Sequence, residues 1–213
     1  MKQTVTNSGV GKWVTRMYDA EKAAGTLKFV DDIEFGPSLL YAKAVRSTVP
    51  HGEIISIDKT EALKVPGVKE VIVGEDFPYR FGLYLKDRSP MAIKKVRYIG
   101  EPVALVVAES EEAAEEGALK VSVKYKELEA VFDPVKAATD NSVLVHPELG
   151  SYEHVDFITP QPGTNIANWF RVRRGDIEKA FKEADYIFEE AVTYPQIAHG
   201  FLEPHCCVCV QDP

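Results

Sequence analysis

One short segment near the end of the chain holds the densest cluster of side chains that could do chemistry. Its polar, aromatic and thiol residues are Gln196, His199, Phe201, Glu203, His205, Cys206, Cys207 and Cys209. Histidine, cysteine and glutamate are common zinc ligands, and Cys206 and Cys209 have the spacing of many zinc sites. A metal site is therefore the first hypothesis that this segment raises.

The expected conformation of the segment argues against zinc. Residues 206–210 are predicted to form a strand, in which Cys206 and Cys209 point to opposite faces. His205, Cys207 and Cys209 share a face but spread over roughly 13 Å. We therefore favour buried cysteines that act as small hydrophobic residues, and expect free thiols and no metal ligand. His199 and Glu203 are four residues apart, and in a helical turn they would form a hydrogen-bonded pair that steadies a loop.

Other mechanisms find little support in the sequence. It has no GxxxxGK[ST] phosphate loop, GxGxxG fingerprint or GxSxG nucleophile elbow. A net charge of −8 without a long Lys/Arg run argues against nucleic-acid binding. No stretch approaches the roughly 18 apolar residues that span a bilayer, and the first residues form no apolar signal core. Because the cysteines are confined to residues 206–209, we expect a reducing, cytoplasmic location.

The elements that must position these residues fall into four regions. We expect an extended arm (1–37), a compact region of strands and short helices (38–140), a turn-rich linker (141–164) and an incomplete last region (165–213). The first proteolytic cuts are expected between about Glu148 and Thr164 in the linker, because turns lie at the surface, or after Tyr194 in the incomplete last region.

Apolar patterning predicts the elements of the compact region. Strands are predicted near 40–46, 54–57, 68–73 and 121–125, and the continuous apolar run Val103–Ala108 is expected at the centre of a sheet. Asp58 with Glu61 suggests a capping box, and Ser110 suggests the N-cap of a helix whose small residues approach the sheet closely. Strand, helix and strand in succession predict a right-handed crossover on one sheet.

The last region is expected to begin a second sheet. Strands are predicted at 168–172, 186–194 and 206–210. Asp176 is the expected N-cap of a helix with Ile177, Ala180, Phe181 and Ala184 on its inner face.

These segments, taken in order, resemble the xanthine dehydrogenase/aldehyde oxidase family over essentially the whole chain. Gly100–Ala108, the acidic helix after it and Val123–Val131 resemble that family's alpha/beta hammerhead domain. Gly25–Asp32 resembles its entry arm, and Arg46–Asp58 resembles its first hairpin. Gly175–Asp185 resembles the opening of its molybdenum-cofactor domain, and His199–Pro204 resembles the segment that reaches the cofactor.

The resemblance implies an α+β fold, with a hammerhead domain followed by the first strands and helix of the molybdopterin-binding domain. It implies the N-terminal portion of the molybdenum-binding subunit of a hydroxylase, an oxidoreductase that adds oxygen from water to a purine, another N-heterocycle or an aldehyde. Purine or a related N-heterocycle is the leading candidate substrate. In the complete enzyme, Gln196, His199, Phe201 and Glu203 would lie near the molybdenum–molybdopterin cofactor. No catalytic residue is expected in this chain.

One departure and one alternative accompany this interpretation. Many family members carry Gln two residues before the counterpart of His199, where this chain has Ile197, with Gln196 one step away. The rest of the subunit, and partner chains or domains with FAD and 2Fe–2S clusters, are implied partners. Because the family's subunit is several times longer, we expect the chain alone to be inactive. The alternative is a non-catalytic hammerhead module that serves as an assembly surface.

Overall fold

The computed structural model describes residue 11 and residues 13–33, 35–140, 143–203 and 205–210. The chain divides into two compact units, one of Ser38–Ile187 and one that combines Met1–Pro37 with Phe188–Pro213. The second unit contains helix α1 (Asp19–Ala24) and the short 3-10 turn η1 (Val30–Asp32).

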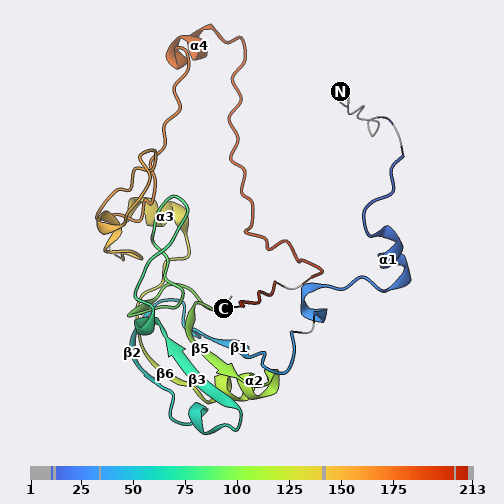
Figure 1. Cartoon of the computed structure of the whole chain (residues 1–213). Coiled ribbons are helices and arrows are strands. Elements are labelled where there is room, and N and C mark those ends of the chain that lie inside the picture. Colours follow the sequence, from blue (N-terminus) through green and yellow to red (C-terminus); the bar gives the residue numbers. More distant parts are fainter. Residues whose placement is uncertain (1–10, 12, 34, 141–142, 204, 211–213) are drawn as a thin grey trace, which may run out of the picture. The chain divides into compact units, whose positions relative to one another are not determined.

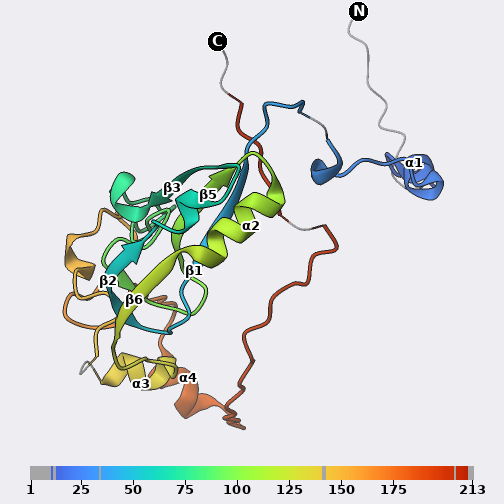
Figure 2. The ribbon, with the colours of Figure 1, turned by 90° about the horizontal axis from the view of Figure 1, so that it is seen from below.

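The Ser38–Ile187 unit contains two three-stranded antiparallel sheets (Figures 1 and 2). The first has the order β1 (Tyr41–Arg46), β5 (Pro102–Ala108), β3 (Val68–Val73). The second has the order β4 (Lys95–Val96), β2 (Gly52–Asp58), β6 (Ser122–Glu127). The helices are α2 (Glu111–Lys120), α3 (Pro134–Thr139) and α4 (Ile177–Glu183), and the 3-10 turns are η2 (Ala62–Lys64), η3 (Gly74–Asp76) and η4 (Leu149–Ser151).

Strand β5 is the centre of the core, as its continuous apolar run predicts. Ala104 and Val106 pack with Val71 in one buried cluster, whereas Val103 packs with Val96 in another. Because alternate residues of a strand point to opposite faces, a strand buried on both faces is apolar throughout. The prediction for Val103–Ala108 is confirmed.

Helix α2 also follows its sequence signals. The Ser110 hydroxyl accepts a hydrogen bond from the Ala113 N–H at 3.2 Å, which confirms the predicted N-cap. A Cβ atom on Gly117 would lie 2.8 Å from Val106 Cγ1 and 2.9 Å from Val68 Cγ2. The small residues of this helix therefore let it lie directly against the first sheet.

Three expectations about this unit were wrong. Strand β6 does not continue the sheet of β5 but pairs with β2, because β1 and β3 already occupy both edges of β5. Strands β1 and β2 likewise belong to different sheets and do not form a hairpin. Asp58 accepts from the Thr60 N–H, and the helical turn that follows is only Ala62–Lys64, so the predicted capping box is absent from this described stretch.

The predicted strands of the last region were also wrong. The described residues of 168–172, 186–194 and 206–210 pair with no strand (Figure 1). An isolated strand has no partner for its backbone N–H and C=O groups, so the pattern of side chains does not suffice to form one. Helix α4 is present, and Asp176 caps it through the Lys179 N–H at 3.0 Å, but its predicted inner face is exposed, with Ile177 at 66% and Phe181 at 55%.

No helix in the described part of the chain is both long and apolar enough to cross a membrane.

Candidate functional site

The four residues predicted to approach a cofactor lie on an irregular, exposed segment of the second unit. Gln196, His199, Phe201 and Glu203 are all exposed. The rings of His199 and Phe201 stack with centroids 5.5 Å apart and planes 19° apart, and the rings of Phe201 and His205 lie 4.7 Å apart. The structure therefore brings three ring side chains together into one short stack.

The structure does not show the His199–Glu203 hydrogen bond that a helical turn would allow. Glu203 Oε1 instead accepts a hydrogen bond from the backbone N–H of Val30 at 3.3 Å, across 173 positions of the chain. The reason is conformational, because only a helical turn brings residues four apart together, and this segment has no helix among its described residues. Nothing in the local sequence pattern pointed to Val30.

The three cysteines are exposed free thiols, so the expectation of buried cysteines was wrong for this chain. No described strand pairs with 206–210, and the face predicted to be apolar is exposed there. Local desolvation, and then the carboxylates of Asp31 and Glu203, raise the pKa of the Cys206 thiol. Within the described residues, no three His, Cys, Asp or Glu side chains gather as a metal site would require.

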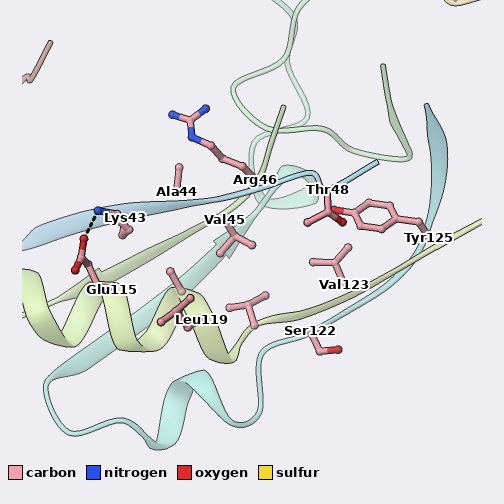
Figure 3. Close-up of a pocket in the computed structure, with 12 residues that line it drawn as sticks. Lys43, Ala44, Val45, Arg46, Thr48, Glu115, Leu119, Ser122, Val123 and Tyr125 are labelled. Atoms are coloured by element: carbon pink, nitrogen blue, oxygen red, sulfur yellow. Dashed lines mark hydrogen bonds and ion pairs between the residues drawn. The ribbon is translucent and has the colours of Figure 1, made fainter. Parts of the chain in front are cut away.

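The Ser38–Ile187 unit has an open groove of about 680 Å³ that sequence reasoning missed (Figure 3). It lies between β1, α2 and β6, and aliphatic side chains dominate its wall. Its lining residues are Lys43, Ala44, Val45, Arg46, Thr48, Glu115, Ala118, Leu119, Val121, Ser122, Val123 and Tyr125. Lys43 and Glu115 form an ion pair at one end (Figure 3).

The groove has the character of a packing surface. Strands β1 and β6 are each at the edge of a sheet, so both present backbone groups beside it. Among the described residues that line it, the only charged pair is the exposed Lys43–Glu115 bridge, which lacks the burial of an acid–base catalyst. The alternation of Val121, Val123 and Tyr125 with polar residues is the sequence signal that could have indicated this face.

A polar network ties residues 143–155, here called the strap, to the rest of the same unit. Glu148 Oε1 accepts from Arg97 Nη2 at 2.7 Å and from Arg80 Nη2 at 3.2 Å. The Arg80 guanidinium also lies 4.5 Å from the centre of the Tyr152 ring. Two arginines therefore share one carboxylate of the strap, and one of them also covers an aromatic ring of the strap.

Backbone contacts extend this attachment along the strap. Lys95 Nζ donates to the carbonyls of Leu144 and Val145 at 3.1 and 3.3 Å, and the Val155 N–H donates to the Tyr84 carbonyl at 3.0 Å. Asn165 also bonds the strap, because its Oδ1 accepts from the Val145 N–H at 2.9 Å. The strap is thus an ordered part of its unit.

The network contains the groups with the largest pKa shifts. Burial, and then the positive charge of Arg97, lower the pKa of His146 to about 4. Its Nδ1 lies 2.8 Å from the Tyr152 hydroxyl, and burial together with the Glu148 carboxylate raises the pKa of Tyr152 to about 12. Burial alone would raise the pKa of Glu148, but hydrogen bonds and Arg97 hold it below its usual value. Because these groups are paired with one another, the shifts indicate a structural network.

Comparison with known proteins relates both units to one family. Residues 24–129 match the sequence model of a domain described as "Aldehyde oxidase and xanthine dehydrogenase, a/b hammerhead domain". Residues 158–213 match that of a "Molybdopterin cofactor-binding domain".

Individual relatives agree with these matches. The chain is 35% identical over 193 residues to a probable xanthine dehydrogenase subunit of Bacillus subtilis, covering 90% of this chain and 24% of that protein. It is 32% identical over 205 residues to the nicotinate dehydrogenase large molybdopterin subunit of Eubacterium barkeri, covering 95% and 44%. The chain therefore spans less than half the length of these relatives.

A solved structure supports the fold. The aldehyde oxidoreductase of Desulfovibrio gigas is 32% identical and superimposes with a TM-score of 0.57, over 62% of this chain and 16% of that one. The two domain matches follow one another along the chain in the order that the resemblance predicts. The α+β architecture and the relatives agree with them. The chain accordingly belongs to the xanthine dehydrogenase/aldehyde oxidase family, as its alpha/beta hammerhead domain followed by the start of its molybdopterin cofactor-binding domain.

Proposed function

We propose that this chain forms part of the molybdenum-binding subunit of a hydroxylase that oxidises an N-heterocycle, a purine or an aldehyde with oxygen from water. The match of residues 158–213 to a molybdopterin cofactor-binding domain carries the proposal. Among the possible substrates an N-heterocycle is favoured, because the names of two relatives refer to xanthine and nicotinate, which are both nitrogen heterocycles.

The residues of the segment fit a cofactor that brings its own metal ligands. The described part of the chain gathers no cluster of His, Cys, Asp and Glu that could hold a metal ion. In molybdopterin the dithiolene sulfurs bind the metal, so the protein needs to supply orientation and hydrogen bonds. When bound, this cofactor supplies the oxygen transfer and accepts the electrons of the oxidation.

Four side chains of this chain would then act around the cofactor. The Gln196 amide and the His199 ring would donate hydrogen bonds to its oxygen atoms, because both carry N–H donors on an exposed segment. Phe201, stacked on His199, would keep water from that side. Glu203 would shape the segment. Electrons would leave through 2Fe–2S clusters and FAD on partner subunits or other domains, in a cytoplasmic complex.

For the domain organisation, we propose an arm of residues 1–37, a hammerhead domain of residues 38–140, a linker of residues 141–164 and a cofactor-binding region from residue 165. The two matched ranges leave residues 130–157 between them, which supports a linker in this part of the chain. Much of this linker is the strap, which is bonded to the Ser38–Ile187 unit.

The test is molybdenum content, measured by inductively coupled plasma mass spectrometry on the complete subunit expressed with its partners. His199→Ala should lower molybdenum content and turnover at least about tenfold, as expected when a residue that orients a metal site is removed. His154→Ala is the matched control, because His154 is exposed and its ring bonds its neighbour's carbonyl. A complete subunit without molybdenum would favour the alternative, an assembly module that uses the groove of Figure 3.

A further inference from the structure

The arm and the cofactor-approaching segment belong to the same compact unit, although they lie at opposite ends of the chain. Their contact is formed by the 3-10 turn η1 and by Glu203, whose Oε1 accepts from the Val30 N–H at 3.3 Å. In Figure 1 the segment, coloured red, passes beside the arm, coloured blue, at this turn.

The turn is built to present this N–H. The Asp32 carboxylate accepts from the Phe29 N–H at 3.0 Å, and the Asp32 N–H donates to the Phe29 carbonyl, also at 3.0 Å. The N–H and the carbonyl of Phe29 and the N–H of Asp32 are therefore bonded within the turn. The N–H of Val30 needs a partner from elsewhere, as the first N–H groups of any helical turn do. A carboxylate is a strong acceptor for such a donor, because the hydrogen bond is charge-assisted.

The same two segments also interact through charge. Local desolvation, and then the carboxylates of Asp31 and Glu203, raise the pKa of the Cys206 thiol. Val30 thus bonds the segment directly, and the charge of the next residue, Asp31, acts on a second residue of the segment.

We propose that Glu203 is a positioning residue that latches the 199–206 segment onto the N-terminal arm. Phe201 and His205 lie two positions before and after Glu203, and their rings belong to one stack with His199. Anchoring Glu203 between them therefore fixes the direction of the whole stack. The latch is independent of the proposed function, whereas its role in presenting His199 and Phe201 to a cofactor rests on it.

The latch can be tested by cross-linking in the 213-residue chain. With Cys207→Ser and Cys209→Ser, Cys206 is the only native cysteine that remains. Asp31→Cys in this background should form an intramolecular disulfide with Cys206 under mild oxidation, detected by intact mass after alkylation. Asp19→Cys, on helix α1 of the same arm, is the control and should remain free. Absence of the disulfide from the Asp31→Cys chain, or an equal yield from the control, would overturn the latch.

Val30→Pro then removes the N–H donor. Proline is favoured at the first position of a helical turn and prefers an extended residue before it, as Phe29 is, with φ −85° and ψ 171°. The cross-linked fraction at equilibrium with a thiol buffer should fall about fivefold, the effect of losing one exposed hydrogen bond, whereas Val30→Ala keeps the N–H and should change little. An equal yield from both variants would show that the hydrogen bond does not hold the segment.

The positioning role is tested in the complete subunit. Val30→Pro should lower molybdenum content at least about threefold relative to Val30→Ala, while circular dichroism shows the same melting temperature for both. Full molybdenum content in Val30→Pro would overturn the positioning role. If the parent subunit held no molybdenum, the proposed function would fail, and the positioning role with it, while a cross-link in the 213-residue chain would still establish the latch.

Discussion

Glu148 is the residue on which the strap depends most. Its carboxylate accepts from both Arg97 and Arg80, and the Arg97 side chain is only 14% exposed. Removing the negative charge would leave Arg97 and Arg80 without the carboxylate to which both donate. Buried or half-buried charge pairs respond more strongly to such a change than exposed ones do, because solvent screens them less.

We expect Glu148→Gln to lower the free energy of unfolding by about 1–2 kcal/mol, the cost of leaving charged donors without their ionised partner. Urea denaturation followed by circular dichroism would measure it. Glu61→Gln is the matched control, since Glu61 forms an exposed ion pair with Lys64, with both side chains 66% exposed. Such pairs contribute little, and the control should lie within about 0.5 kcal/mol of the parent. Equal effects of the two substitutions would show that Glu148 does not hold the strap.

His146 should make stability depend on pH. Its pKa is lowered from 6.5 to about 4 on folding, by burial and by Arg97, so between these values the unfolded chain binds more protons than the folded one. The contribution of neutral His146 to the free energy of unfolding is therefore fully present above pH 6.5 and is lost as the pH falls toward 4. We expect a loss of roughly 2 kcal/mol, allowing for partial solvent screening.

The comparison with His146→Gln isolates this effect from the titration of carboxylates. Glutamine can still hydrogen-bond the Tyr152 hydroxyl but has no proton to gain in this range. Urea unfolding at several pH values should show a shallower loss of stability below pH 6.5 in the variant. Parallel curves for the two proteins would mean that His146 titrates normally in the folded state.

At the scale of elements, the packing of α2 on the first sheet is limited by Gly117. A Cβ atom at this position would lie within 3.0 Å of Val106 and Val68, so no side chain fits there without movement. Glycine lowers the helix propensity at this position, but its lack of a side chain allows α2 to approach the sheet this closely.

Gly117→Leu should lower the free energy of unfolding by about 2–3 kcal/mol, because extra methylene groups would push α2 away from β5 and β3. Thermal denaturation and urea titration would both report it. Glu116→Leu places the same side chain at the exposed neighbouring position and should cost less than about 0.5 kcal/mol. A Gly117→Leu variant as stable as this control would contradict the close packing.

For the molecule as a whole, the contacts of the strap change where proteolysis is expected. The sequence predicts the first cuts either in the turn-rich stretch of about residues 148–164 or after Tyr194. In the structure, Tyr152 is only 5% exposed, whereas Phe170, Phe188 and Tyr194 are 72%, 90% and 84% exposed on segments that pair with no strand among the described residues. Protease sites follow local exposure and local unfolding more than composition.

Brief digestion with chymotrypsin should therefore cut first after Phe170, Phe188 or Tyr194 and last after Tyr152, as read from fragment masses over time. In Glu148→Gln, cleavage after Tyr152 should become faster while the other sites keep their rates. Early cleavage after Tyr152 in the parent chain would show that the strap is loosely held and that the turn-rich composition was the better guide.

Much of what was predictable from sequence is local. The continuous apolar run of β5, the N-caps Ser110 and Asp176 and the small residues of α2 are visible in a few neighbouring positions, and each was found where it was predicted. The ordered set of such segments also sufficed for the family resemblance, which the domain matches bear out. Local pattern and propensity carry this information because they depend on neighbours in the chain.

The remaining features depend on partners far away in the chain. Strand β6 joins β2 because the edges of β5 are taken, the segments near 168–172 and 186–194 stay irregular where no described strand pairs with them, and Glu203 bonds Val30 instead of His199. The strap likewise lies on its unit through Arg80 and Arg97. The spacing of side chains predicts which face of an element a residue occupies. Only the folded chain determines which distant backbone group or charged side chain it contacts, because several groups compete for the same few partners.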